Sequence, residues 1–134
     1  MKKLFRHHLW DILWGVLIIV LTGIPGTMLP KVPAFIDLFE PDKLVHIFIF
    51  AVLVALMMRG FILHEGKAIS RDLAVLISIN AGILLGALTE LMQKYIVPCR
   101  SASIYDFIAD SVGCFIGWWL FSIWLKRRTG RSEK

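Results

Sequence analysis

The chain has 134 residues, of which 57% are hydrophobic, and its mean hydropathy of +0.73 excludes an ordinary soluble domain. Fifteen Lys and Arg residues against ten Asp and Glu residues give a formal net charge of +5. The length leaves room for one small domain over residues 1–134, and we expect that domain to be embedded in a membrane.

Four apolar runs come close to the length of about 20 residues that a helix needs to cross the hydrocarbon core of a bilayer. The connections between them are short, so no separate domain outside the membrane is expected. The sequence therefore predicts an all-α bundle of four transmembrane helices. The runs are Ile12 to Leu29, Leu44 to Leu63, Leu73 to Val97 and Ile104 to Leu125.

The first run follows the basic segment Met1 to His8, which is also how a cleaved signal peptide begins. The run continues past the usual length of such a peptide, and no A-x-A-like cleavage site follows it. We therefore expect an uncleaved anchor, with Pro25 kinking or ending the helix. The apolar residues of the next segment, Pro30 to Pro41, indicate that it lies on the membrane surface.

Basic residues predict the orientation of the spans, because cytoplasmic loops retain Lys and Arg. Eleven basic residues fall on the side that holds both termini, and four fall on the other side. We therefore expect both termini in the cytoplasm. The pI of about 9.5 is then explained by flanks that face anionic lipid, and no pattern typical of a nucleic-acid-binding module accompanies it.

Ionisable residues in or beside the apolar runs are costly, so they mark functional sites or buried pairs. With the predicted topology, the last three runs place such residues at the non-cytoplasmic end, and spacings of three or four residues keep some of them on one helical face. We expect a shared polar chamber there. Its candidate residues are Asp42, Lys43 and His46 in the second run, Glu90 and Gln93 in the third, Arg100 and Ser103 in the following turn, and Asp106 and Asp110 in the fourth.

Two pairs of glycines predict close helix packing beneath this chamber. Gly82 and Gly86 lie four residues apart in the third run, and Gly113 and Gly117 lie four apart in the fourth. Small residues at this spacing let helix backbones approach one another in membranes.

Three fragments follow one another along the last three runs. They are Asp42-Lys43-x-x-His46, Glu90-x-x-Gln93, and Arg100-x-x-Ser103-x-x-Asp106-x-x-x-Asp110-x-x-Gly113-x-x-x-Gly117. This ordered set resembles the VanZ-like family over roughly residues 23–117, and it departs from the family at Asp110, where members more often carry Asn. The resemblance implies a multi-pass protein of the bacterial plasma (inner) membrane, in a family named for glycopeptide antibiotic resistance. It implies no particular reaction.

Each acidic candidate also has a simpler structural explanation. Asp106, and less readily Asp110, would offset the positive end of a helix dipole. Asp42 would cap the second helix after Pro41, and Glu90 would pair with Lys94 one turn away.

The cationic and imidazole side chains have such explanations too. His46 would be a hydrogen-bonded polar core residue, and Lys43 and Arg100 would extend toward lipid head groups. Arg100 has the better case for phosphate binding, because a guanidinium group matches phosphate oxygens.

The sequence indicates no cofactor. His and carboxylate side chains suit a metal, but no H-E-x-x-H or comparable spacing is present, so a divalent ion stays an alternative. Cys99 and Cys114 are expected at different depths, which disfavours an intrachain disulfide.

Two functions follow, and the sequence does not decide whether the chain is an enzyme. In the first, the polar chamber binds an anionic envelope lipid or a lipid-linked precursor through Asp42, Lys43, Gln93, Arg100 and Ser103. In the alternative, the protein is a membrane-embedded hydrolase or transferase acting on such a lipid by acid-base chemistry. Its catalytic candidates are His46, Glu90, Asp106 and Asp110. A second alternative is a non-catalytic assembly partner whose polar residues only specify helix packing.

Overall fold

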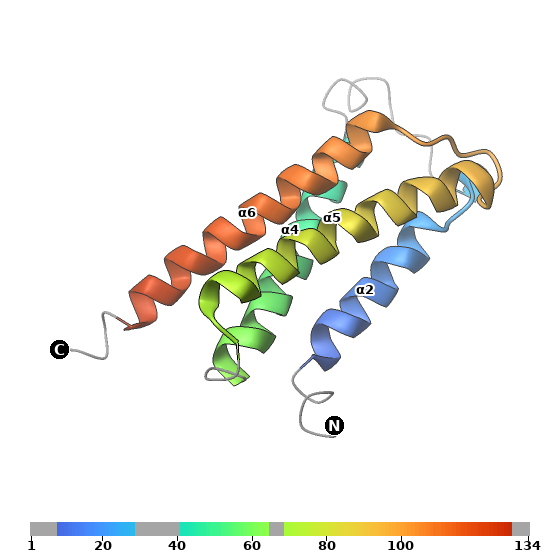
Figure 1. Ribbon diagram of the computed structural model, residues 1–134. Coiled ribbons are helices and arrows are strands. Elements are labelled where there is room, and N and C mark those ends of the chain that lie inside the picture. The colour runs from blue at the N-terminus through green and yellow to red at the C-terminus, as the bar shows by residue number, and fades with distance from the viewer. Residues whose placement is uncertain (1–7, 29–40, 65–68, 130–134) are drawn as a thin grey trace.

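The computed structural model describes residues 8–28, 41–64 and 69–129, and this part of the chain is all-helical (Figure 1). The predicted surface segment, Pro30 to Pro41, falls outside the described residues except for Pro41. The elements in chain order are α2 (Leu9–Thr22), a short 3-10 helix η1 (Gly26–Met28), α4 (Pro41–Arg59) with its π-helical continuation η2 (Gly60–His64), α5 (Arg71–Tyr95) and α6 (Ile104–Thr129).

Three helices are long and apolar enough to cross a membrane, which confirms the last three predicted spans. They cover Asp42–Ile62, Arg71–Tyr95 and Ile104–Thr129. Local sequence explains where they begin. Pro41 stands at the first helical position of α4, where its missing N–H is not needed. The Ser70 hydroxyl accepts a hydrogen bond from the Leu73 amide at 3.3 Å and so caps α5.

The first predicted span is shorter than expected. α2 has 14 residues, which gives a length of about 21 Å at 1.5 Å per residue, less than the hydrocarbon core requires. It ends at Thr22 instead of continuing to Leu29. Gly23 follows as the C-cap, and Pro25 disfavours helical backbone at the residue before it. A fourth crossing of the membrane stays a prediction.

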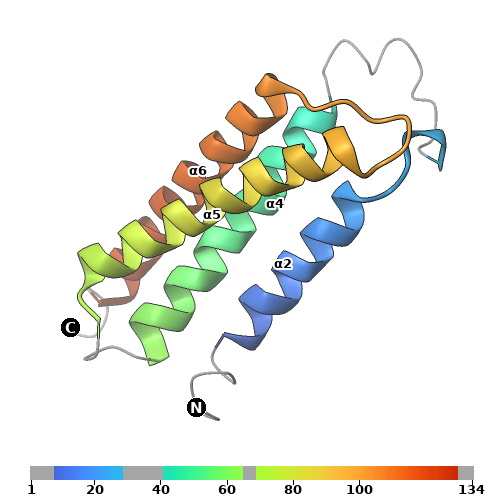
Figure 2. The same ribbon diagram turned by 45° about the vertical axis from the view of Figure 1, so that its right-hand side comes forward.

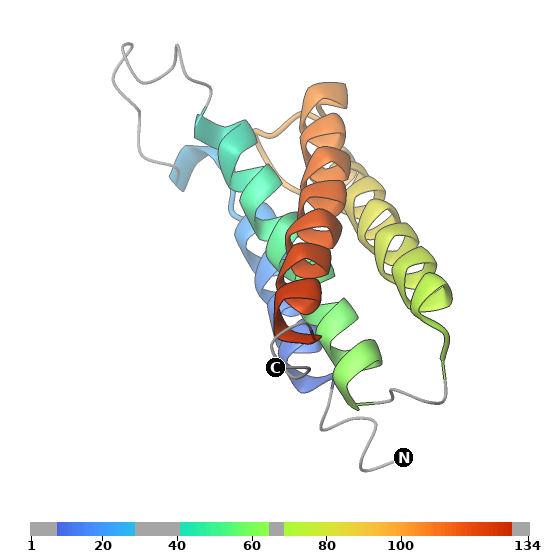
Figure 3. The same ribbon diagram turned by 90° about the vertical axis from the view of Figure 1, so that its left-hand side faces the viewer.

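The four α-helices alternate in direction, so their ends gather at two opposite ends of the bundle (Figures 1 and 2). We call the end at which α4 and α6 begin and α5 finishes the site end. The end at which α2 and α5 begin and α6 finishes is called the basic end. α4 packs against α2, α5 and α6, most extensively against α6, and Figure 3 shows these two helices side by side.

Glycines explain the close contact between α4 and α6. A Cβ atom added at Gly113 would overlap the backbone of Ile47, and one added at Gly117 would overlap the backbone of Ala51. We call these two contacts the glycine seam. The predicted close approach is therefore present, and the partner of the α6 glycines is α4.

The α5 glycines make room for side chains of α6. A Cβ atom at Gly82 would lie 2.6 Å from Cys114 Sγ, and one at Gly86 would lie 3.0 Å from Asp110 Cβ and Oδ2. α6 therefore rests its backbone on α4 and projects small side chains toward α5. Asp110 belongs to this second contact, which fixes its depth in the bundle.

The short helix α2 is attached to this three-helix unit by apolar and polar contacts. Ile18 is fully buried and belongs to the same core as Phe50 and Val54 of α4. The Trp14 indole N–H donates a hydrogen bond of 2.9 Å to the carbonyl of Ile49. α2 thus covers α4 on the side away from α6.

Substituting Ala for Gly113 or Gly117 is expected to lower the free energy of unfolding by about 1–3 kcal/mol, because the added methyl group forces α6 away from α4. Gly15→Ala is the matched control, since its nearest neighbour would be Leu53 Cδ1 at 4.0 Å. It should be neutral or stabilising by up to about 1 kcal/mol. Denaturant titration of the purified protein in mixed micelles measures the free energy of unfolding of the three variants. An equal loss of stability in the control and in the seam variants would contradict the glycine seam.

Candidate functional site

A buried hydrogen bond joins α4 to α6 near the site end. His46 Nδ1 donates to Asp110 Oδ1 at 2.8 Å, and the two residues are only 2% and 0% exposed. The glycine seam sets this pairing, because Ile47 directly follows His46 and Gly113 lies three residues after Asp110. The contact brings together two of the predicted catalytic residues.

Glu90 links α5 to the beginning of α6. Its Oε2 accepts a hydrogen bond from the Ser103 backbone N–H at 2.7 Å, while the Ser103 hydroxyl accepts one from the Asp106 N–H at 3.4 Å. In a capping box, the acid three residues after the cap, here Asp106, would accept the hydrogen bond from the backbone N–H of the cap residue, here Ser103. Glu90 takes this position instead, so Asp106 need not fold back onto its own helix.

The alternative ion pair between Glu90 and Lys94 is not formed in the described part of the chain. Lys94 Nζ lies 5.1 Å from the centroid of the Tyr95 ring. Glu90 is 6% exposed and directs Oε2 to the α5–α6 turn. Its burial therefore reflects a connection between helices.

The acids and the imidazole form two overlapping groups. Ligating atoms of His46, Glu90 and Asp110 lie within 4.8 Å of one another, and all three residues are buried. We call these three the buried cluster. Atoms of Asp42, His46 and Asp106 also lie within 4.8 Å of one another, and Asp42 is exposed in the first turn of α4. The two groups share His46, and Asp42 is their exposed member.

Two basic residues lie near the beginning of α6, one by contact and one along the chain. Lys43 Nζ lies 5.1 Å from the centroid of the Tyr105 ring at the start of α6. Arg100 lies in the α5–α6 turn, where Cys99 adopts the left-handed φ of 58°. Its Nε atom is buried and has no hydrogen-bond partner in the described residues. We call the set of Asp42, Lys43, Arg100, Ser103 and Asp106 the rim.

Gln93 points to a different neighbour. Its Nε2 donates a hydrogen bond of 3.3 Å to the carbonyl of Thr22, the last residue of α2, and Gln93 is 1% exposed. This bond satisfies a carbonyl that the end of α2 leaves without a helical partner. Gln93 therefore attaches α2 to α5, and its role in ligand binding stays a prediction.

One polar pair at the basic end was not foreseen from the sequence. His8 Nδ1 lies 2.8 Å from Asp11 Oδ2, and the His8 ring is tilted against the Phe61 ring, with the ring centroids 4.6 Å apart. Asp11 is buried. The spacing of three residues between His8 and Asp11 indicates that the two side chains can meet on one helical face.

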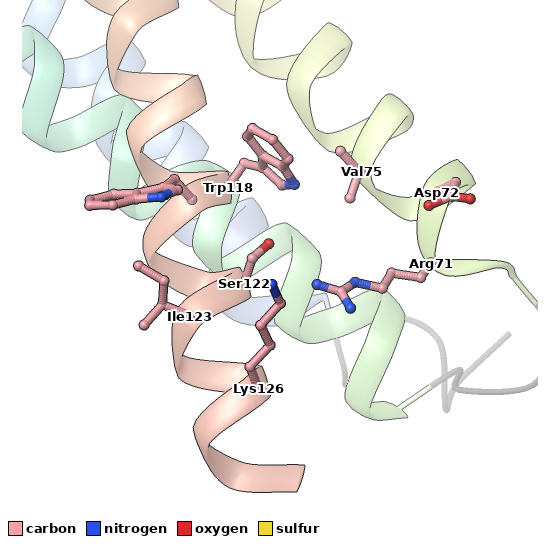
Figure 4. A pocket seen from close by; sticks show the side chains of 8 residues that line it. Arg71, Asp72, Val75, Trp118, Ser122, Ile123 and Lys126 are labelled. Carbon is pink, nitrogen blue, oxygen red and sulfur yellow. The ribbon is translucent and has the colours of Figure 1, made fainter. Parts of the chain in front are cut away.

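The basic end also carries a groove between α5 and α6, with a volume of about 450 Å³. Figure 4 shows the side chains of Arg71 and Lys126 converging near Ser122, with Trp118 above them. We call it the basic groove, and it contains none of the predicted site residues. Its lining residues are Arg71, Asp72, Val75, Trp118, Trp119, Ser122, Ile123 and Lys126.

The buried cluster and the rim offer three kinds of chemistry. An imidazole held by a carboxylate can act as a general base. Guanidinium and ammonium groups with a neighbouring hydroxyl can bind phosphate oxygens. Imidazole with carboxylates can ligate a divalent metal.

Removing the Asp110 carboxylate is expected to destabilise the fold through His46. Asp110→Ala leaves a buried imidazole N–H without an acceptor and should lower the free energy of unfolding by about 1–3 kcal/mol. Asp110→Asn keeps an acceptor oxygen and should lose less. Val112→Ala, at an exposed position of α6, is the control in the same micelle titration. Equal losses in the Ala and Asn variants would contradict the structural role of this hydrogen bond.

Comparison with known protein families identifies a match. A family model described as VanZ/LLP1 matches residues 6–125, which include every residue of the buried cluster and the rim. No curated protein and no solved structure matches the chain. The match covers most of the chain and confirms the resemblance carried by the ordered fragments. The chain therefore belongs to the VanZ/LLP1 family.

Proposed function

We propose that this protein binds the phosphate of an anionic envelope lipid, or of a lipid-linked precursor, at the rim above the buried cluster. The observation that carries the proposal is the Arg100 side chain, whose buried Nε–H has no acceptor among the described residues. A buried donor without a partner is costly, and a guanidinium group bonds phosphate oxygens in a planar, two-point geometry. A phosphate at the rim would supply the missing acceptor.

The surrounding residues fit the same ligand. Ser103 uses its backbone N–H and one oxygen lone pair within the protein, so its hydroxyl proton remains a donor for a ligand. Lys43 places a second cation beside Tyr105, two residues beyond Ser103. Lys43 and Ser103 thus lie at the beginning of α6 and Arg100 lies three residues before Ser103, and the N-terminal dipole of α6 also favours an anion.

The proposal includes an orientation in the bacterial plasma membrane, with the site end outside the cytoplasm. Basic residues support it, because they gather at the basic end and are retained on the cytoplasmic side of membranes. Among the described residues that end carries Arg59, Arg71, Lys126, Arg127 and Arg128, whereas the site end carries Lys43, Lys94 and Arg100.

The buried hydrogen bond between His46 and Asp110 favours a second candidate function, which is hydrolysis or transfer on the bound lipid. A carboxylate at Nδ1 holds the ring in the tautomer whose Nε2 can accept a proton. His46 would take the proton of an attacking water or hydroxyl group, and Asp110 would stabilise the imidazolium that forms. Glu90 or Asp106 would then donate a proton to the leaving oxygen.

Lipid retention tests the binding function. Delipidated wild-type protein, incubated with phosphatidylglycerol and phosphatidylcholine vesicles and repurified, should retain phosphatidylglycerol selectively. Arg100→Gln should reduce this retention by about tenfold or more, since a charge-assisted hydrogen bond contributes about 1.5–3 kcal/mol. Lys94→Gln, at the same end but stacked on Tyr95, is the control, and mass spectrometry quantifies the lipid.

Two results would overturn that proposal. One is equal retention in the Arg100→Gln and Lys94→Gln variants. The other is loss of retention only on Arg71→Gln, which would place the lipid in the basic groove. Conversion of the lipid by wild type, together with retention but no conversion in His46→Ala, would establish the catalytic function instead.

The native cysteines report the orientation. Cys99 is exposed in the α5–α6 turn at the site end, and Cys114 is buried. A membrane-impermeant maleimide added to right-side-out vesicles should therefore label wild-type protein, and Cys99→Ser should abolish the label. Labelling only after the vesicles are inverted would reverse the proposed orientation.

A further inference from the structure

Two buried carboxylate oxygens near the site end of the bundle have no hydrogen-bond partner in the described residues. They are Glu90 Oε1 and Asp110 Oδ2. The second oxygen of each carboxylate is already used, one by the Ser103 N–H and the other by His46 Nδ1. Glu90 and Asp110 are 6% and 0% exposed. Each acid therefore keeps one buried oxygen that no described residue satisfies.

These acids share their surroundings with one imidazole, and each of the three side chains comes from a different helix. The ligating atoms of His46 on α4, Glu90 on α5 and Asp110 on α6 lie within 4.8 Å of one another. Two ligands that are each about 2.1 Å from one ion lie at most about 4.2 Å apart. Small side-chain rotations therefore bring the three groups to metal-binding distances without moving a helix.

The charge of the buried cluster points to a cation. Two carboxylates in a medium of low dielectric constant are unfavourable unless a positive charge or a proton compensates them. Among the described residues, the one ion-pair partner of these two acids is His46, which lies 2.8 Å from Asp110. A divalent ion would neutralise both carboxylates, and it would also bind the two oxygens that lack a hydrogen-bond partner.

A route to the buried cluster is also present. Asp42, His46 and Asp106 form the second group of ligating atoms, and Asp42 is exposed. His46 belongs to both groups, so an ion captured at Asp42 and Asp106 would lie next to the buried cluster. An access path of this kind is required for a metal site to load after folding.

We propose that His46, Glu90 and Asp110 bind one divalent cation of the kind that mixed imidazole and carboxylate sites accept, such as Mn²⁺ or Zn²⁺. Coordination through His46 Nδ1 would replace its hydrogen bond to Asp110 Oδ1, and the proton of the neutral ring would then lie on Nε2. The bound ion would present positive charge to a phosphate at the rim. Only this role of the ion rests on the proposed function. The binding itself is independent of any lipid.

Metal analysis of the full chain tests this site directly. The protein is purified in detergent with a tag that lacks histidine, stripped with a chelator, and titrated with Mn²⁺ while the free ion is followed by electron paramagnetic resonance. We expect one Mn²⁺ per chain. Glu90→Gln and Asp110→Asn, which keep the hydrogen-bond acceptors, should each weaken binding by more than about tenfold. Asp72→Asn, an exposed acid at the basic end, should bind as wild type does.

The outcomes separate this inference from the proposed function. No binding by stripped wild type, or equal binding by all variants, overturns the metal site. Where a variant does not fold, pulsed resonance on wild type decides, because Mn²⁺ in this site must show coupling to an imidazole nitrogen. One bound Mn²⁺ without lipid retention would leave the metal site standing and remove the lipid function. Lipid retention without bound Mn²⁺ would do the reverse.

Discussion

The close contact between the backbones of α4 and α6 determines the rest of the site. Gly113 and Gly117 are the positions at which α6 has no side chain to separate it from Ile47 and Ala51. Contacts four residues apart on both helices fix their relative depth as well as their separation. His46 lies one residue before Ile47, and Asp110 lies three residues before Gly113. Both are therefore closer to the site end than the glycine seam, and they meet only in this register. A shift by one turn would leave both buried without a partner.

The sequence predicted the features that depend on helical period and span length. Three spans, the polar ends of α4, α5 and α6, and the convergence of His46 with Asp110 all follow from apolar length and from spacings of three and four residues. The ordered fragments also predicted the family, which the match over residues 6–125 confirms. Span length, residue spacing and fragment order can all be read along the sequence, so these predictions needed no knowledge of which helices touch.

The remaining contacts depend on which helix faces which, and spacing alone does not determine that. Glu90 and Gln93 lie three residues apart, yet one bonds the α6 cap at Ser103 and the other bonds the end of α2 at Thr22. α2 also ends earlier than its apolar run, because Gly23 caps the helix at its C-terminus and Pro25 disfavours its continuation, although the residues beyond are apolar. Helix pairing and local backbone chemistry therefore account for the predictions that were incomplete.

The charge of the buried cluster limits what the rim can bind. Carboxylates at Glu90 and Asp110 oppose an approaching phosphate, and the low dielectric constant of the bundle strengthens that repulsion. Lys43 and Arg100 offset part of it from the rim, but they do not bond the buried oxygens that lack partners. An Asn at position 110 would remove one charge and keep an acceptor for His46, whereas Asp requires a proton or a cation. Asp110 therefore couples the packing of His46 to the affinity of the rim, since the group that neutralises it also lowers the barrier to an anionic ligand.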